Sequence, residues 1–255
     1  MYTTIAAAIL IPFFGTSLGA GTALLLKNRL PERMNRLCGG FAAGVMTAAS
    51  VWSLLIPAIE QSLEGAKIAF LAVPAGLACG ILTMIGTERA VDTLYRRRKT
   101  GKGGLSGAAF MMLAVTLHNV PEGLAVGVAC AGLTGAAKAL SPAGVAALAM
   151  GVALQNIPEG AIISLPLLTA GKPRGRAFWA GVLSGAVEPV AALCALLAAA
   201  PVIRLMPFFL SFAAGAMLYV TVQELIPEAV DDRSHEGSVS FCVGFALMMV
   251  MDVLL

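Results

Sequence analysis

Two nearly identical heptapeptides place polar side chains inside apolar sequence. Leu117–Gly123 reads LHNVPEG, and Leu154–Gly160 reads LQNIPEG. In each copy the first polar residue stands four positions, and the asparagine three positions, before the glutamate, so all three share one face of a helix. The polar residues of the two copies are His118, Asn119, Glu122, Gln155, Asn156 and Glu159.

These residue types indicate metal chemistry once Glu188, near the middle of a third apolar run, is added. An imidazole with carboxylate and amide oxygens suits a divalent transition metal, whereas a closed structural zinc site uses mostly Cys and His. Three carboxylates repel one another unless protons or cations neutralise them. Hydrogen bonding between helices explains a single buried Asn or Gln, but it does not explain a repeated set with a third carboxylate.

The elements that hold these residues are predicted to cross a membrane. The chain has 255 residues, of which 58% are hydrophobic and 12% charged, against about 25% charged in soluble domains. Runs of about 20 apolar residues span a bilayer. We therefore expect an all-α polytopic membrane protein with a single transmembrane domain, whose eight helices are residues 3–26, 38–59, 68–86, 105–130, 142–169, 177–200, 205–226 and 237–255.

The positions of the basic residues predict the orientation. Of the 17 Lys and Arg residues, 14 fall in the connections after the first, third, fifth and seventh predicted spans. Such connections stay in the cytoplasm, which places both termini on the extracytoplasmic side. The net charge of +3 is small and its basic residues lie in short loops, so the sequence does not support nucleic-acid binding.

The paired motif resembles the ZIP (Zrt/Irt-like) family of metal-ion transporters. The tract GFAAGVMTAASVWSLLIPAIE, Gly40–Glu60, is similar to the bacterial GufA-like branch, and GAVEPV, Gly185–Val190, is similar to the sixth-helix motif of the family. The resemblance implies a ZIP-like bundle in the bacterial cytoplasmic (inner) membrane, working as a homodimer. It also implies import of divalent metal ions, Zn²⁺ first, with Fe²⁺, Mn²⁺ or Cd²⁺ as further candidates.

The resemblance further implies a binuclear site between the fourth and fifth helices. The first metal position would use His118, Glu122, Gln155, Glu159 and Met46, and the second would use Asn119, Glu122, Asn156, Glu159 and Glu188. The metal is cargo in this interpretation, and no prosthetic group is expected. Helices 1, 4, 5 and 6 would carry it past helices 2, 3, 7 and 8 in an elevator-type motion.

Other polar residues are candidates for the path of the metal outside this site. Ser53 lies seven residues after Met46, about two helical turns toward the outside, and Glu60 and Glu64 follow at the predicted outer mouth. Polar helix ends that meet water explain the two glutamates equally well. On the cytoplasmic side the candidates are Glu224 and His235. Because Gln223 stands where some relatives carry a histidine, we expect a release site built on Glu224 to be weak or missing.

Two other functions remain open from the residues alone. A metal-selective cation channel would use an acidic ring. An intramembrane metalloenzyme would need a motif such as H-E-x-x-H with a third ligand, whereas this chain has the spacing H-x-x-x-E and a single histidine, His118, within the predicted spans.

Overall fold

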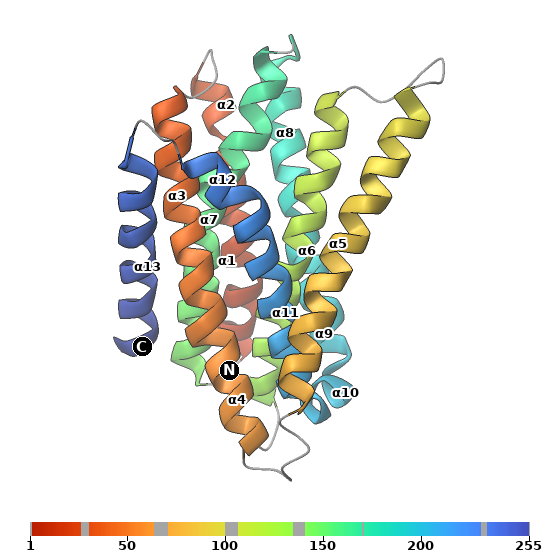
Figure 1. Ribbon diagram of the computed structural model, residues 1–255, viewed down its shortest axis with the longest axis vertical. Helices are drawn as coiled ribbons and strands as arrows, with labels where there is room; N and C mark the ends of the chain where they lie inside the picture. The colour runs from red at the N-terminus through yellow and green to blue at the C-terminus, as the bar shows by residue number, and fades with distance from the viewer. Residues whose placement is uncertain are drawn as a thin grey trace.

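Long helices that run roughly parallel make up the computed structural model of the protein, which describes residues 2–26, 31–63, 71–99, 107–134, 141–169, 171–230 and 234–254. These residues contain no β-strand. The C-terminal ends of α2, α5, α7 and α12 and the N-terminal ends of α3, α6, α8 and α13 lie at the upper end in Figure 1, and both chain termini lie toward the lower end. The helices are α1 (Tyr2–Ala20), α2 (Thr22–Leu25), α3 (Glu32–Ala49), α4 (Ile56–Leu63), α5 (Ala72–Lys99), α6 (Gly107–Thr134), α7 (Pro142–Thr169), α8 (Arg174–Gly185), α9 (Val187–Leu197), α10 (Ala199–Arg204), α11 (Met206–Val220), α12 (Ile226–Ala229) and α13 (Glu236–Leu254).

Six segments among the described residues are long and apolar enough to cross a membrane. They are Tyr2–Leu25, Glu32–Leu63, Pro142–Leu168, Arg174–Leu197, Met206–Ala229 and Glu236–Leu254. Each coincides with a predicted span to within six residues at either end. The other two predicted spans, 68–86 and 105–130, overlap α5 and α6, which are not among the six. An all-helical, multi-pass membrane protein is therefore confirmed.

The predicted span 177–200 is divided into α8 and α9 by a turn at Ala186. Pro189 explains the break, because proline has no backbone N–H to donate to the carbonyl of Gly185 and its ring crowds that carbonyl. Glu188 consequently stands in the first turn of α9. A helix N-terminus carries positive partial charge, which favours a carboxylate at this position.

Two short π-helical segments continue the helices before them: η1 (Ser50–Leu55) follows α3, and η3 (Thr221–Leu225) follows α11. Each comes just before an Ile-Pro pair, with Pro57 after η1 and Pro227 after η3. A proline in a helix clashes with the carbonyl four residues earlier, and the wider π turn relieves that clash. The two segments carry Ser53 and Glu224, respectively.

Glycines bring particular helices into backbone contact. A Cβ added to the contact glycines would collide with the backbone of a partner helix in five pairs, α1 with α7, α6 with α9, α3 with α13, α5 with α11 and α12 with α13. Following the division of helices that the family resemblance implies, we call α1, α6, α7, α8 and α9 the motif group, and α3, η1, α4, α5, α11, η3, α12 and α13 the frame group. The glycines concerned are Gly15, Gly19, Gly160, Gly123, Gly127, Gly40, Gly44, Gly244, Gly76, Gly80, Gly215 and Gly237.

The contact at Gly151, between the groups, is of a different kind. A Cβ added to Gly151 on α7 would meet the thioether of Met248 on α13 and, at 3.7 Å, a methyl group of Val45 on α3, all of them side-chain atoms. Backbone-to-backbone contact therefore joins the helix pairs within the groups, whereas flexible side chains fill the boundary at this glycine. Such close backbone approach is typical of helices that associate within lipid.

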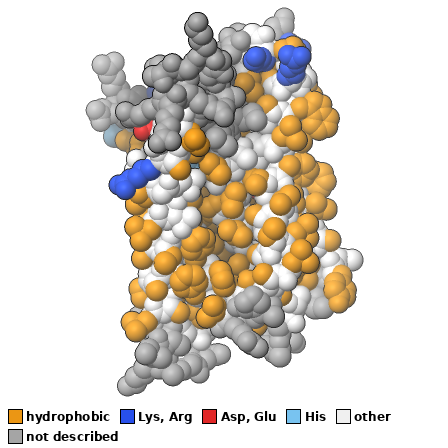
Figure 2. Space-filling view, turned by 90° about the vertical axis from the view of Figure 1, so that its right-hand side faces the viewer, with side chains coloured by type: hydrophobic (Ala, Val, Ile, Leu, Met, Phe, Trp, Pro, Cys, Tyr) orange, Lys and Arg blue, Asp and Glu red, His pale blue; other side chains and the backbone are white. Residues whose placement is uncertain are grey.

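The outer surface suits a bilayer. Figure 2 shows apolar side chains over most of the described surface between the two ends, and the visible Lys and Arg side chains lie in its upper part. Large apolar residues on the outside include Phe14, Leu82, Trp179 and Val243, each at least 56% exposed. Such a surface would promote aggregation in water, but it is the expected one in hydrocarbon.

Candidate metal centre

The two heptapeptides lie within α6 and α7, in the interior of the bundle. Five of their six polar side chains are at most 7% exposed, and Glu159 is partly exposed. Both helices continue through their internal prolines, Pro121 and Pro158. The five buried residues are His118, Asn119, Glu122, Gln155 and Asn156.

The two helices contact each other through these side chains. Gln155 Nε2 donates a hydrogen bond of 2.7 Å to Glu122 Oε1. Asn119 hydrogen-bonds to the carboxylate of Glu159, which is also close enough to Glu122 to interact with it electrostatically. Asn156 lies beside Glu122. The structure therefore brings together the six motif residues that the sequence predicted to meet.

Glu188 joins this cluster from α9. Its side chain is 1% exposed, and Asn119 Nδ2 lies 3.3 Å from its Oε1 atom. Asn156 and the carboxylate of Glu122 are also near neighbours. Thr16 on α1 donates a hydrogen bond of 2.7 Å to the same Oε1 atom. The depth of Glu188 in its apolar run indicated that it would join the motif residues, whereas nothing in the sequence of α1 shows that Thr16 contacts it.

A cavity of about 150 Å³ leads away from this cluster, with α6 and α7 on one side and the frame group on the other. Met46 of α3, only 2% exposed, lines it beside the motif residues. The cavity continues along Val220 and Glu224 to Glu228 of α12, and α12 stands near the upper end in Figure 1. The remaining lining residues are Gly39, Ala42, His118, Glu122, Gln155, Pro158, Glu159, Ile162 and Leu225.

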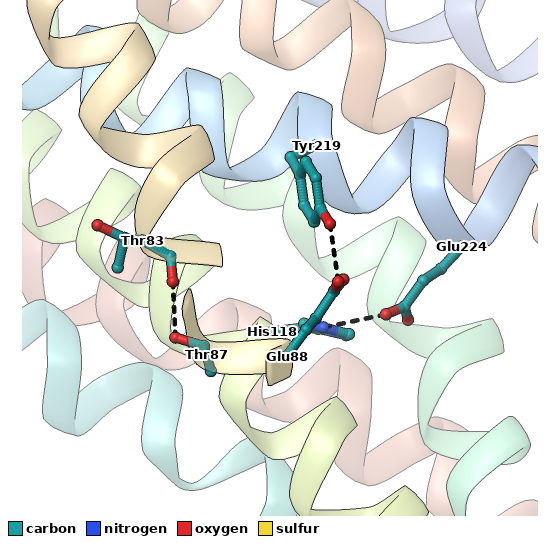
Figure 3. A network of polar contacts seen from close by, with 6 residues as sticks. All are labelled: Thr83, Thr87, Glu88, His118, Tyr219 and Glu224. Atoms are coloured by element: carbon teal, nitrogen blue, oxygen red, sulfur yellow. Dashed lines mark hydrogen bonds and ion pairs between the residues drawn. The ribbon is translucent and has the colours of Figure 1, made fainter. Parts of the chain in front are cut away.

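Glu224 has polar neighbours on other helices that the sequence did not predict. Its Oε1 atom lies 3.2 Å from His118 Nε2 (Figure 3). One ligand atom each of Glu224, His118 and Glu88 lie within 4.8 Å of one another, and Tyr219 donates a hydrogen bond of 2.7 Å to Glu88 Oε2. The expected weakness rested on Gln223, which is exposed and does not line the cavity. His118 and Glu88 lie near Glu224 from other helices, and the expectation that a release site at Glu224 is weak or missing stays a prediction.

The residues expected to form an outer path do not all lie together in the structure. Ser53 is 6% exposed and donates a hydrogen bond of 2.6 Å to Asp252 Oδ1 near the end of α13. Asp252 is itself partly buried in this pair. Glu60 is exposed on α4, and Glu64 lies outside the described residues. His235, also exposed, precedes α13 at the opposite end of the bundle.

The donor atoms of the cluster fit a divalent cation. Four buried side-chain oxygens there have no hydrogen-bond partner in the protein, namely Glu122 Oε2, Gln155 Oε1, Asn156 Oδ1 and Glu188 Oε2, and the amide nitrogen Asn156 Nδ2 has none either. Buried polar atoms are nearly always hydrogen-bonded, so an unpaired set needs an explanation. A bound cation would satisfy the four oxygens, although it would not satisfy the amide nitrogen. The carboxylates buried side by side also need protons or cations to neutralise them.

The chain is similar to known proteins along nearly its whole length. The family model for the ZIP Zinc transporter matches residues 98–252, which include both heptapeptides. Zinc transporter ZIP11 of Bos taurus is 32% identical, with 99% of this chain and 98% of the relative covered. Zinc transporter GufA of Myxococcus xanthus is 34% identical, with 94% of each covered. Zinc transporter ZIPB of Bordetella bronchiseptica is 37% identical, with 95% of this chain and 78% of the relative covered.

Proposed function

The chain belongs to the ZIP zinc transporter family, and from that premise we propose that it carries divalent transition-metal ions, chiefly Zn²⁺, across the bacterial cytoplasmic membrane into the cytoplasm. The observation that carries this proposal is the buried ligand cluster around Glu122, at the inner end of a cavity between two helix groups. Fe²⁺, Mn²⁺ and Cd²⁺ are further candidate substrates, because the same mixture of nitrogen and oxygen donors suits them.

We place the protein in the membrane as one domain of eight spanning helices with both termini outside. The connections at the upper end in Figure 1 are those that carry most of the Lys and Arg residues, and this bias supports a cytoplasmic location for that end. The cavity runs from the cluster toward α12 at the same end. The arrangement therefore supports an inward-facing state, in which the metal is released.

The cluster is proposed to hold two ions that share Glu122 and Glu159. The first would lie at His118, Gln155 and Met46, and the second at Asn119, Asn156 and Glu188. Support comes from the unpaired oxygens, since Gln155 contributes one toward the first position and Glu188 one toward the second. A single imidazole nitrogen together with amide oxygens should bind a metal ion with moderate affinity, which suits an ion that must also be released.

Movement of the motif group along the frame group is proposed as the transport step. The backbone contacts at glycines lie within the groups, whereas Gly151 meets side-chain atoms across the boundary. An apolar cavity of about 380 Å³ also lies among α6, α9, α10 and α11. Side-chain contact at Gly151, together with this cavity, supports an elevator-type motion. We further propose a homodimer, which light scattering in detergent would test.

Release toward the cytoplasm is proposed to pass from His118 to Glu224 and Glu88. We expect Glu224→Gln to lower the maximal uptake rate by about tenfold, a size typical of changes around metal ligands, because the amide keeps the shape of the side chain but loses its charge. The measurement is initial Zn²⁺ uptake into proteoliposomes over a range of concentrations. The matched control is Glu228→Gln, an exposed carboxylate on the same cavity, which should change the rate less than twofold because exposed charges interact weakly.

A competition assay tests the proposed substrate class. Proteoliposomes that contain the protein should accumulate labelled Zn²⁺, and Fe²⁺, Mn²⁺ and Cd²⁺ should compete with it, whereas Mg²⁺ and Ca²⁺ should not, because both prefer all-oxygen ligands. Failure of the protein to raise Zn²⁺ accumulation above that of empty liposomes would contradict the proposal. Single-channel currents in planar bilayers would favour the channel instead.

A further inference from the structure

Thr16, in the last third of α1, reaches the candidate metal cluster although no heptapeptide residue lies on this helix. Its side chain is fully buried, and its hydroxyl lies 2.7 Å from Glu188 Oε1. The second acceptor near the hydroxyl, the carbonyl of Pro12, is at 3.5 Å. A hydroxyl has one proton to donate, and the shorter contact shows that it is directed to Glu188.

The two oxygens of Glu188 have different surroundings. Oε1 faces two donors, the Thr16 hydroxyl at 2.7 Å and Asn119 Nδ2 at 3.3 Å. Oε2 is buried and has no hydrogen-bond partner. The two donors hold the Oε1 side of the carboxylate in place. The Oε2 atom is therefore available to donate a lone pair to a metal ion. Hydrogen bonds of this kind to the outer oxygen of a carboxylate ligand set its orientation and strengthen metal binding.

The surroundings of Thr16 fix its position as well. A Cβ added to Gly160, next to Glu159, would collide with the Thr16 carbonyl, and one added to Gly185 would lie 2.7 Å from Thr16 Cβ. Thr16 thus fits at the level of the cluster because two residues on two other helices are glycines without a Cβ. Because α1, α7 and α9 meet at this residue, the distance from its hydroxyl to Glu188 is held by packing and not by a flexible loop.

We propose that Thr16 is a positioning residue for the second metal ion, holding Glu188 through Oε1 so that Oε2 faces the ion bound with Asn119 and Asn156. The proposal rests on the proposed function, because it assigns α1 a part in the same binuclear site. It adds that the hydroxyl governs the ion beside Glu188 while leaving the ion beside His118 unaffected.

The test compares two substitutions at this position in the full-length purified protein. Thr16→Val keeps the branched shape and removes the hydroxyl, whereas Thr16→Ser keeps the hydroxyl. Titration with Cd²⁺ and Zn²⁺ by calorimetry should show two ions in the wild type. In Thr16→Val one of the two ions, assigned to the position at Glu188, should bind about 10- to 100-fold less tightly, with the affinity of the other changed less than twofold, and Thr16→Ser should restore the wild-type result.

A second comparison separates positioning from a general loss of structure. In a Glu188→Gln background, Thr16→Val should cause no further loss of affinity, because the group on which it acts has already been replaced. Three results would each overturn the inference. In the first, Thr16→Val lowers the metal affinity equally with and without the Glu188→Gln substitution. In the second, Thr16→Val weakens both ions together, and in the third, Thr16→Ser behaves like Thr16→Val. A wild-type protein that binds two ions while Thr16→Val binds them equally well would overturn it too. A wild-type protein that neither binds nor transports metal would instead refute the proposed function.

Discussion

Replacing both Glu122 and Glu159 by glutamine should abolish Zn²⁺ uptake by proteoliposomes. These two carboxylates are the only motif residues assigned to both metal positions, and each stands where α6 and α7 face each other. Glutamine preserves the size and one acceptor oxygen of each side chain, so the fold should persist. The charge that balances the ions is lost, however, and we expect uptake to fall by at least about 100-fold, beyond the effect of altering groups around the ligands.

The control for this prediction removes the same amount of charge elsewhere. Glu32 and Asp92 are exposed carboxylates of the frame group, and the double variant Glu32→Gln with Asp92→Asn should retain uptake within about twofold, because exposed charges contribute little. Elution of both variants as single symmetric peaks in size-exclusion chromatography would show that they fold. Near-normal uptake by the Glu122 and Glu159 double variant would exclude the cluster as the transport site.

The composition of the site could be read from the sequence because its parts lie close together along the chain. Spacings of three and four residues put His118, Asn119 and Glu122 on one helix face regardless of how the bundle packs. The equal depth of Glu188 in its own span brought in a third helix. The spacing argument depends only on the geometry of a single helix, and the depth argument depends only on the thickness of the bilayer. Both quantities are known before the packing of the helices is known.

The contacts that were missed depend on which helices pack together. Thr16 and Glu88 reach the site from α1 and α5, and no spacing within either helix indicates their partners. The position of Gln223 beside Glu224 gives no sign that His118 of α6 lies 3.2 Å from that carboxylate. The pairing of Asp252 with Ser53 likewise depends on the packing of α13 against η1.

Replacing Gly80 by alanine should destabilise the protein, although alanine is the better helix former. Gly80 is buried on α5, where an added Cβ would collide with the carbonyl of Phe212 and lie 2.9 Å from the backbone nitrogen of Ala216. Neither atom belongs to a side chain that can turn away, so α5 and α11 would have to separate. Overpacking of this kind costs about 1–3 kcal/mol, and we expect the thermal unfolding midpoint in detergent to fall by several degrees.

Substitutions at two other glycines test whether the packing within a group differs from the packing at the boundary between the groups. Gly86, on the same helix as Gly80, has nothing within 4 Å of an added Cβ, so Gly86→Ala should leave the midpoint unchanged or raise it slightly, since alanine is favoured in helices by up to about 1 kcal/mol. Gly151 meets the flexible Met248 thioether across the boundary. Gly151→Ala should therefore keep the midpoint within about a degree of the wild type yet slow uptake, because the added methyl group lies where one group must slide past the other. If Gly80→Ala left the midpoint unchanged, or if Gly151→Ala lowered it equally, the division into two rigid groups would have to be abandoned.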